Sequence, residues 1–202
     1  LNTKVKEFIN KLKPVYDAIK LTRKNLDKKK SLIGFIGAPW TLMIYLLNLK
    51  HNNKINEEKL FEEKDNIELI LKKLDECLKE HIFHQKKAGA DIIQIFDSWA
   101  GLIPTKLLSQ YCFEPNKSLV KFCRSNKVAS ICFPKGIKET YVDFVNIVGP
   151  DGINIDSDIN PMWASTHLKN ICLQGGMNPE FLLKDDKLII DEVDKYLSIF
   201  KN

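Results

Sequence analysis

Residues 31–47 read Ser-Leu-Ile-Gly-Phe-Ile-Gly-Ala-Pro-Trp-Thr-Leu-Met-Ile-Tyr-Leu-Leu, and this stretch decides the fold. Its first six residues form an apolar, β-branched run, which is typical of a strand in a parallel sheet covered on both faces. Pro39 then stands where the first turn of a helix accepts proline. The apolar side chains beyond it follow the i, i+3, i+4, i+7 spacing of a helical stripe: Trp40, Met43, Ile44 and Leu47. The stretch therefore predicts a buried strand, a tight turn and a helix over residues 39–48.

The same unit recurs along the chain. Four further apolar runs have strand character: residues 91–96, 128–133, 152–155 and 170–173. The segments with helical patterns are residues 1–30 (one leading helix kinked at Pro14), 56–87, 104–125, 138–148, 161–169 and 185–201. This alternation predicts an α/β fold with a parallel sheet and right-handed crossovers.

The number of strands limits the architecture. A complete (β/α)8 TIM barrel needs eight strands and about 250 residues. Five parallel βα units therefore suit either an open doubly wound sheet or a partial barrel. We expect one domain over residues 1–202, with the leading helix first, the βα units over residues 31–202, and a polar loop at residues 50–54.

Composition disfavours several classes of function. Basic residues outnumber acidic ones by 31 to 26, but only Arg23 and Arg124 are arginine, the residue on which nucleic-acid recognition usually relies. Five cysteines without CxxC spacing argue against a disulfide framework or a zinc ribbon. No apolar stretch reaches the roughly 20 residues of a membrane span, and residues 1–30 lack an apolar signal core. We expect a cytoplasmic protein that binds neither nucleic acid nor a membrane.

Metal and cofactor motifs are also missing from the sequence. His81 and His84 are three residues apart next to Glu80, but no third ligand is evident, so we interpret them as a surface pair. No GxGxxG, Walker loop or GxSxG occurs. We therefore expect chemistry without a bound cofactor.

The residues that follow the predicted strands are the candidates for function, because ligands of parallel α/β folds bind at the carboxyl ends of the strands. The candidates in or after these ends are Gly37, Trp40, Tyr45, Asp97, Ser98, Lys135, Asp156 and Asp158.

Each of these side chains also has a structural interpretation. Tyr45 could reach a polar cavity with its hydroxyl or only cover the barrel edge. Asp97 and Ser98 could contact a ligand or cap a helix. Asp156 could act as an acid, a base or a metal ligand, or again as a cap. Lys135 could hold an anion or form a Schiff base, or be an ordinary exposed ammonium.

Two long motifs resemble a known family. Residues 34–45, Gly-Phe-Ile-Gly-Ala-Pro-Trp-Thr-Leu-Met-Ile-Tyr, are similar to the signature segment of uroporphyrinogen decarboxylase. So are residues 89–91, Gly-Ala-Asp, together with residues 94–101, Gln-Ile-Phe-Asp-Ser-Trp-Ala-Gly. Shorter segments follow in the family's order at residues 133–136, 155–156 and 173–175, and the resemblance spans residues 32–179.

The resemblance implies a (β/α)8 barrel that acts as a cytoplasmic homodimer in haem biosynthesis. Such an enzyme converts uroporphyrinogen III to coproporphyrinogen III by removing four acetate carboxyls, without metal or organic cofactor. Tyr45 falls on the family's substrate-binding tyrosine, and Ser98 falls on the position whose hydroxyl contacts the substrate. The positions that the resemblance makes supporting are Gly37, Trp40, Asp97, Lys135 and Asp156.

The sequence also departs from the family's pattern. The Arg-Gln-Ala-Gly-Arg segment, the strand-end aspartate that faces the pyrrole nitrogens and the Gly-His-Gly segment are absent, so we expect the family's catalytic groups outside this chain. The five strands would then be the third to the seventh of the barrel. Ser157 stands where an aromatic residue is usual, and Asn178 belongs to a Gly-Met-Asn-Pro segment where Asn-Leu-Asp-Pro is usual.

Three readings follow. The sequence begins with Leu and is poor in arginine, which favours an internal fragment of a decarboxylase, inactive by itself. A corrinoid- or thiol-linked methyltransferase of the same superfamily would need a His-x-Cys zinc motif, and none occurs. The third reading is a truncated, non-catalytic chain that serves only as an interaction surface.

Overall fold

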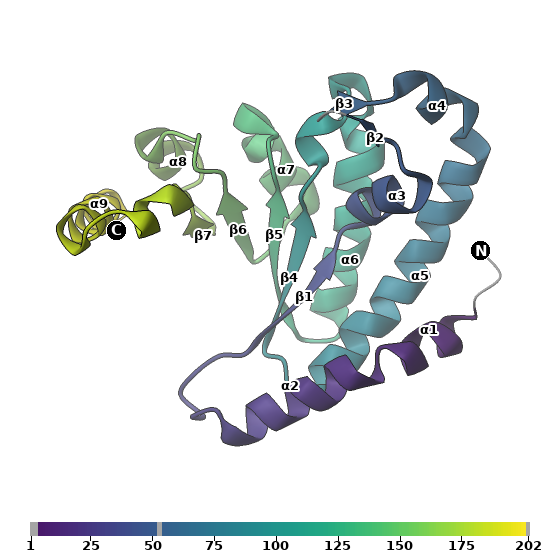
Figure 1. The fold of residues 1–202 in the computed structure, drawn as a ribbon, viewed down its shortest axis with the longest axis horizontal. Helices are drawn as coiled ribbons and strands as arrows, with labels where there is room; N and C mark the ends of the chain where they lie inside the picture. The colour runs from purple at the N-terminus through teal and green to yellow at the C-terminus, as the bar shows by residue number, and fades with distance from the viewer. Residues whose placement is uncertain (1–3, 52–53, 201–202) are drawn as a thin grey trace.

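The computed structural model describes residues 4–51 and 54–200. The chain forms a parallel five-stranded sheet in the order β1-β4-β5-β6-β7 and a small antiparallel hairpin, β2-β3 (Figure 1). The strands are β1 (Ile33–Gly37), β2 (Lys50–His51), β3 (Lys54–Ile55), β4 (Ile92–Asp97), β5 (Ala129–Pro134), β6 (Gly152–Ile155) and β7 (Cys172–Gly175). The helices are α1 (Val5–Lys11), α2 (Lys13–Asn25), α3 (Pro39–Leu47), α4 (Glu57–Glu62), α5 (Lys64–Ala88), α6 (Glu114–Ser125), α7 (Tyr141–Val148), α8 (Pro161–His167) and α9 (Asp186–Ile199).

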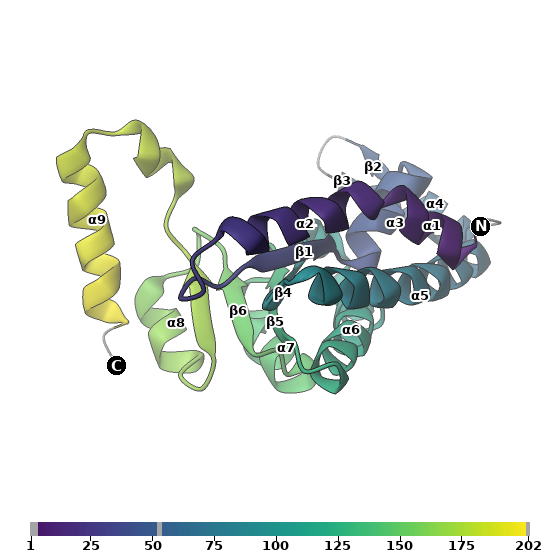
Figure 2. The same ribbon diagram turned by 90° about the horizontal axis from the view of Figure 1, so that it is seen from below.

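The predicted fold class is confirmed: five parallel βα units follow one another, as in a partial (β/α)8 barrel. Each large-sheet strand lies within two residues of its predicted start, because each coincides with an apolar run. Figure 2 shows α5, α6, α7 and α8 following one another around one side of the sheet, with α9 at the far end of the molecule from α5.

The core lies between the sheet and these helices. Ile93 and Ile95 of β4, Cys132 of β5 and Ile153 of β6 are fully buried on the helix-facing side. Side chains of α3, α5, α6 and α7 pack against them: Trp40, Met43, Ile44, Ile82, Leu119 and Phe144. Burying an isoleucine or leucine contributes about 1.5–3 kcal/mol, so this layer supplies much of the stability.

The other face of the sheet is less buried, and the expectation of strands covered on both faces was wrong for β1 and β7. Ile33 and Phe35 are exposed while Gly34 and Ile36 are buried, which is an alternating pattern. Phe35 is 65% exposed and begins an edge-to-face row of rings with Phe96 and Phe133. This face corresponds to a barrel interior, where opposing strands rather than helices would cover it.

Several expected helices are interrupted. The leading helix breaks at Leu12 rather than bending at Pro14, because proline fits the first turn of the new helix α2, where its missing N–H leaves no bond unmade. The helix expected over residues 56–87 breaks at Glu63. The one expected over residues 104–125 becomes a 3-10 turn, a π-helical turn at Ser109–Phe113 and α6.

The loop expected at residues 50–54 contributes both strands of the β2-β3 hairpin, although residues 52–53 lie outside the described part. Among the described residues, no helix combines the length and the apolar character that crossing a bilayer requires.

Candidate active site

The carboxyl ends of the strands meet along one edge of the sheet, and backbone hydrogen bonds join their loops. The N–H of Lys135 donates to the carbonyl of Asp97 at 3.1 Å, and the N–H of Gly101 donates to the carbonyl of Lys135 at 2.8 Å. The segments after β4 and β5, which hold Ser98 and Lys135, therefore lie side by side.

Asp97 is the buried centre of this edge. Its side chain is 1% exposed and points to the helix side of the sheet. The Thr41 hydroxyl donates to Oδ1 at 2.8 Å, and Asn116 Nδ2 donates to Oδ2 at 3.2 Å. Burial raises the pKa of Asp97 to about 6, although the hydrogen bonds from Thr41, Asn116 and Cys112 act in the opposite direction.

The Asp97 carboxylate lies at the N-terminus of α3. The backbone N–H of Thr41, in the first turn of α3, donates to the Asp97 carboxylate. A carboxylate at this end of a helix satisfies an unpaired N–H and is favoured by the helix dipole. Asp97 therefore caps α3, the preceding helix in the chain, rather than the turn that follows its own strand.

Tyr45 and Ser98 are both neighbours of Trp99, Tyr45 in space and Ser98 in the chain. Tyr45 is 62% exposed in the last turns of α3, and its ring meets the Trp99 ring edge to face at 6.4 Å. Ser98 is half-buried and directly precedes Trp99 in the chain. The Trp99 backbone is fixed from α3, because its N–H donates to the Thr41 hydroxyl and its carbonyl accepts from Trp40 Nε1 at 2.9 Å.

Gly37 and Trp40 have structural roles in the same unit. Trp40 is fully buried and stacks on Tyr111 at 5.4 Å. A Cβ at Gly37 would come within 2.8 Å of Leu42 Cδ2, so a larger residue here would require the Leu42 side chain to shift.

Lys135 follows β5 and Asp156 follows β6, and a hydrogen bond joins their two loops. Lys135 is exposed, whereas Asp156 is buried and accepts from the Gly136 N–H at 2.7 Å and the Tyr141 hydroxyl at 3.0 Å. Burial and the neighbouring Asp156 charge raise the pKa of Tyr141. Asp156 thus fixes the loop that carries Lys135, and its carboxylate is committed to these partners.

Sequence reasoning missed Thr41, Asn116 and Tyr141, whose side chains hold the two buried carboxylates. Asn116 lies 19 residues after Asp97, and only the π-helical turn at Ser109–Phe113 and the start of α6 bring it back to the strand end. The sequence did offer one indication for Thr41, because it lies four residues before Tyr45 and therefore on the same face of the helix.

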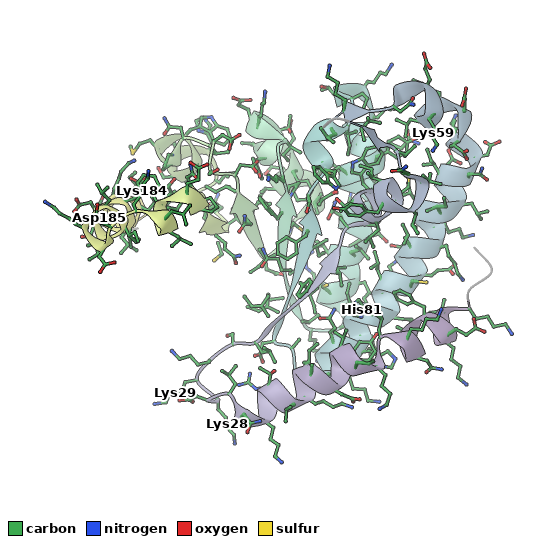
Figure 3. The ribbon with its side chains drawn as sticks, viewed as in Figure 1. Lys28, Lys29, Lys59, His81, Lys184 and Asp185 are labelled. Carbon is green, nitrogen blue, oxygen red and sulfur yellow. The ribbon has the colours of Figure 1, made fainter. Side chains whose placement is uncertain are left out.

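The interpretation of His81 and His84 as a surface pair was wrong for His81. Its ring is 8% exposed, on the side of α5 that faces α1 and α2 (Figure 3). Nδ1 lies 3.0 Å from the Tyr16 hydroxyl and Nε2 lies 3.1 Å from Gln85 Nε2. The described residues contain no group of three His, Cys, Asp or Glu side chains placed to hold a metal ion.

A cavity of about 640 Å³ lies elsewhere, between β7, α8 and α9. Its lining includes Leu168, Leu173, Tyr196 and Phe200, and none of the predicted site residues. The candidate residues at the strand-end edge therefore lie outside this cavity.

The family model described as "Uroporphyrinogen decarboxylase (URO-D)" matches residues 2–202. The chain belongs to the uroporphyrinogen decarboxylase family. Curated relatives named uroporphyrinogen decarboxylase include two from Orientia tsutsugamushi, which are 38% (strain Boryong) and 40% (strain Ikeda) identical over 200 and 197 residues. A third, from Rickettsia bellii, is 36% identical over 197 residues.

The chain spans only part of these family members. The three alignments cover 95%, 94% and 96% of this chain, but 58%, 56% and 58% of the respective relatives. A solved methyltransferase from Methanosarcina mazei matches with a TM-score of 0.56 at 17% identity, over 90% of this chain and 64% of that one. At this identity the likeness supports the fold alone.

Proposed function

We propose that the protein containing this chain is a uroporphyrinogen decarboxylase, which converts uroporphyrinogen III to coproporphyrinogen III by four acetate decarboxylations. The observation that carries the proposal is the family match over residues 2–202. The proximity of Tyr45, on the helix that follows β1, to Trp99, which directly follows Ser98 at the end of β4, supports it. We further propose that the complete protein is a cytoplasmic homodimer built on a single barrel, to which this chain contributes five βα units.

In the proposed reaction, a pyrrole ring carbon is protonated, and the resulting cation takes up the electrons of the breaking C–C bond as CO2 leaves. A second protonation turns the exocyclic methylene into a methyl group, and loss of the proton from the ring carbon restores the pyrrole, so that each step consumes one proton and releases one CO2. This chain's contribution is to bind and orient the substrate. The hydroxyls of Tyr45 and Ser98 hydrogen-bond to it. Exposed Lys135 places a positive charge where a polycarboxylate substrate has negative ones.

The remaining candidates act through the scaffold. Gly37 and Trp40 form the turn into α3, and Asp97 and Asp156 fix the loops after β4 and β5. In this proposal the proton donors and the arginines for the substrate carboxylates come from the rest of the complete protein. The chain alone is then inactive, and neither a metal nor an organic cofactor takes part.

The test is an activity assay on the complete protein. Chelator-treated protein should convert uroporphyrinogen to coproporphyrinogen, measured chromatographically after oxidation to the porphyrins. Tyr45→Phe and Ser98→Ala should each lower kcat/KM about 10-fold, as expected for one lost hydrogen bond to a charged or buried partner. The matched controls are Tyr196→Phe and Ser125→Ala, whose hydroxyls bond to the backbone carbonyls of Gly176 and Phe122 rather than to a candidate site residue.

The alternative is a methyltransferase of the same superfamily, favoured only by the name of the structural neighbour. Stoichiometric zinc in the complete protein and methyl transfer without CO2 release would support that alternative and refute the decarboxylase. Failure of purified complete protein to release CO2 would leave the non-catalytic reading.

A further inference from the structure

One hydroxyl joins the two elements that carry the proposed substrate contacts. Thr41 Oγ1 donates to Asp97 Oδ1 at 2.8 Å and accepts from the Trp99 N–H at 3.3 Å. Ser98 is the residue between these two partners. Tyr45 lies one helical turn after Thr41, on the same side of α3. Thr41 therefore joins the helix that carries Tyr45 to the segment that carries Ser98, beside the bond from Trp40 Nε1 to the Trp99 carbonyl.

The Asp97 carboxylate completes this arrangement from two sides. Oδ1 receives the Thr41 hydroxyl and Oδ2 receives Asn116 Nδ2, so the carboxylate links α3 to α6. Asn116 Nδ2 is itself held by the Cys112 carbonyl at 2.8 Å, in a π-helical turn of the kind often found at functional sites. An amide in place of Asp97 would offer only one acceptor oxygen for these donors.

Burial of the Asp97 carboxylate is unfavourable for stability, so packing alone does not explain this residue. Asp97 is almost completely buried, and within residues 4–51 and 54–200 no lysine or arginine forms an ion pair with it. Burying an unpaired charge destabilises a fold unless hydrogen bonds compensate. Groups of this kind persist where the geometry that they impose has a use.

We propose that Asp97, Thr41 and Asn116 form a positioning cluster that holds the Tyr45 and Ser98 hydroxyls in register for the same tetrapyrrole substrate. The proposal rests on the proposed function and deepens it: none of the three side chains touches the substrate, and Thr41 is the link between the two that do. Its specific consequence is that Thr41 acts on substrate binding through Tyr45 and Ser98.

The first test is Thr41→Val in the complete protein, which removes the hydroxyl and keeps the shape. Two hydrogen bonds are lost, and we expect KM for uroporphyrinogen to rise about 10-fold while kcat changes less than about 3-fold, because the lost contacts serve binding. Thr41→Ser, which keeps the hydroxyl, should restore the KM. Thr166→Val is the matched control: it removes an exposed α8 hydroxyl that bonds only to the Met162 carbonyl.

A double-mutant cycle separates positioning from stability. In the Tyr45→Phe, Ser98→Ala background, Thr41→Val should change KM less than about 2-fold, because the residues through which it acts are gone. An undiminished 10-fold effect in that background, or an unchanged KM in the single variant, would overturn the proposal. If Thr41→Val does not fold, Asn116→Leu tests the other side of the cluster and should raise KM about 3-fold in the same direction.

An activity-free measurement distinguishes failure of this inference from failure of the proposed function. Loss of the Thr41 hydroxyl should speed amide hydrogen exchange at Trp99 about 10-fold and weaken the nuclear Overhauser contact between the Tyr45 and Trp99 rings. If the wild-type protein is inactive but Thr41→Val produces both changes, the positioning cluster is supported and the decarboxylase proposal is refuted. If the wild-type protein is active but Thr41→Val changes neither signal, only the positioning cluster is refuted.

Discussion

His81 offers a prediction that does not depend on any activity. Its ring is buried between α5 and α2, with Tyr16 and Gln85 as hydrogen-bond partners. The Gln85 amide N–H₂ donates to the Phe35 carbonyl, and its second hydrogen faces His81 Nε2, which makes Nε2 an acceptor and leaves the proton on Nδ1. The imidazole is therefore neutral in the folded chain. Burial first, and the neighbouring His84 second, lower the pKa of His81 to about 4.

The sign of the effect follows from linkage. A histidine whose pKa falls from 6.5 when unfolded to about 4 when folded binds fewer protons in the folded state throughout that window. Its contribution to stability is present above pH 6.5 and is lost as the pH falls towards 4. The full loss amounts to about 3 kcal/mol, of which about 2 kcal/mol is reached by pH 5.

Asp97 changes the free energy of unfolding in the opposite direction over nearly the same pH range. Its pKa is raised from 3.8 to about 6, so its folded form gains stability as the pH falls through 6, by about 1 kcal/mol at pH 5. The two groups partly cancel in the wild-type profile. A difference between variants is needed to see either one.

The decisive variant is His81→Asn, which keeps a donor towards Tyr16 and does not titrate in this range. Urea unfolding followed by circular dichroism between pH 7 and pH 5 should show the free energy of unfolding of the variant gaining about 2 kcal/mol on the wild type as the pH falls. His167→Asn on α8 is the control for replacing an exposed histidine with asparagine. Parallel profiles for His81→Asn and wild type would refute the buried neutral imidazole.

Three further predictions concern the scaffold of the site. Gly101→Ala places a Cβ within 2.7–2.9 Å of the Gly136 backbone, and the forced shift should cost about 1–3 kcal/mol, measured by the urea midpoint. Trp40→Phe keeps the buried ring but removes the bond to the Trp99 carbonyl, so unfolding free energy should fall by about 1–2 kcal/mol in the same assay, with no gain at any pH. Ile93→Ala empties a fully buried position on β4 and should destabilise by about 2–5 kcal/mol, seen as a lower melting temperature in calorimetry.

The sheet was predictable because it rests on local signals. Each large-sheet strand is a short apolar run next to a polar turn, and these runs lie within two residues of the observed strands. The helix break at Glu63 was not predictable in the same way, since it lies in a continuous helical pattern, whereas Pro14 indicated a break close to Leu12 but not its exact position. The burial of His81 depends on segments that are distant in the chain: Tyr16 lies 65 residues away and reaches it only through the packing of α2.

Only part of the candidate site could be predicted from the sequence. Gly37, Ser98 and Lys135 could be placed at one edge because parallel strands bring their carboxyl ends together. The environment of Asp97 could not be inferred, because strand alternation states that Asp97 and Ser98 point to opposite sides but not which side is covered. The structure settles that Asp97 faces the helices and is buried among Thr41 and Asn116.

The same arrangement of a buried carboxylate occurs twice along the edge of the sheet. Asp97 after β4 and Asp156 after β6 are both buried carboxylates, and each accepts from a backbone N–H and from a side-chain donor on a helix. Each one fixes a segment that ends in an exposed polar side chain, Tyr45 in the first case and Lys135 in the second. Because rigid supports lie beneath exposed contacts, substituting the supports should disturb the geometry of binding and the stability together, whereas substituting the contacts should disturb binding alone. That difference is what the Thr41 and Tyr45 variants are designed to measure.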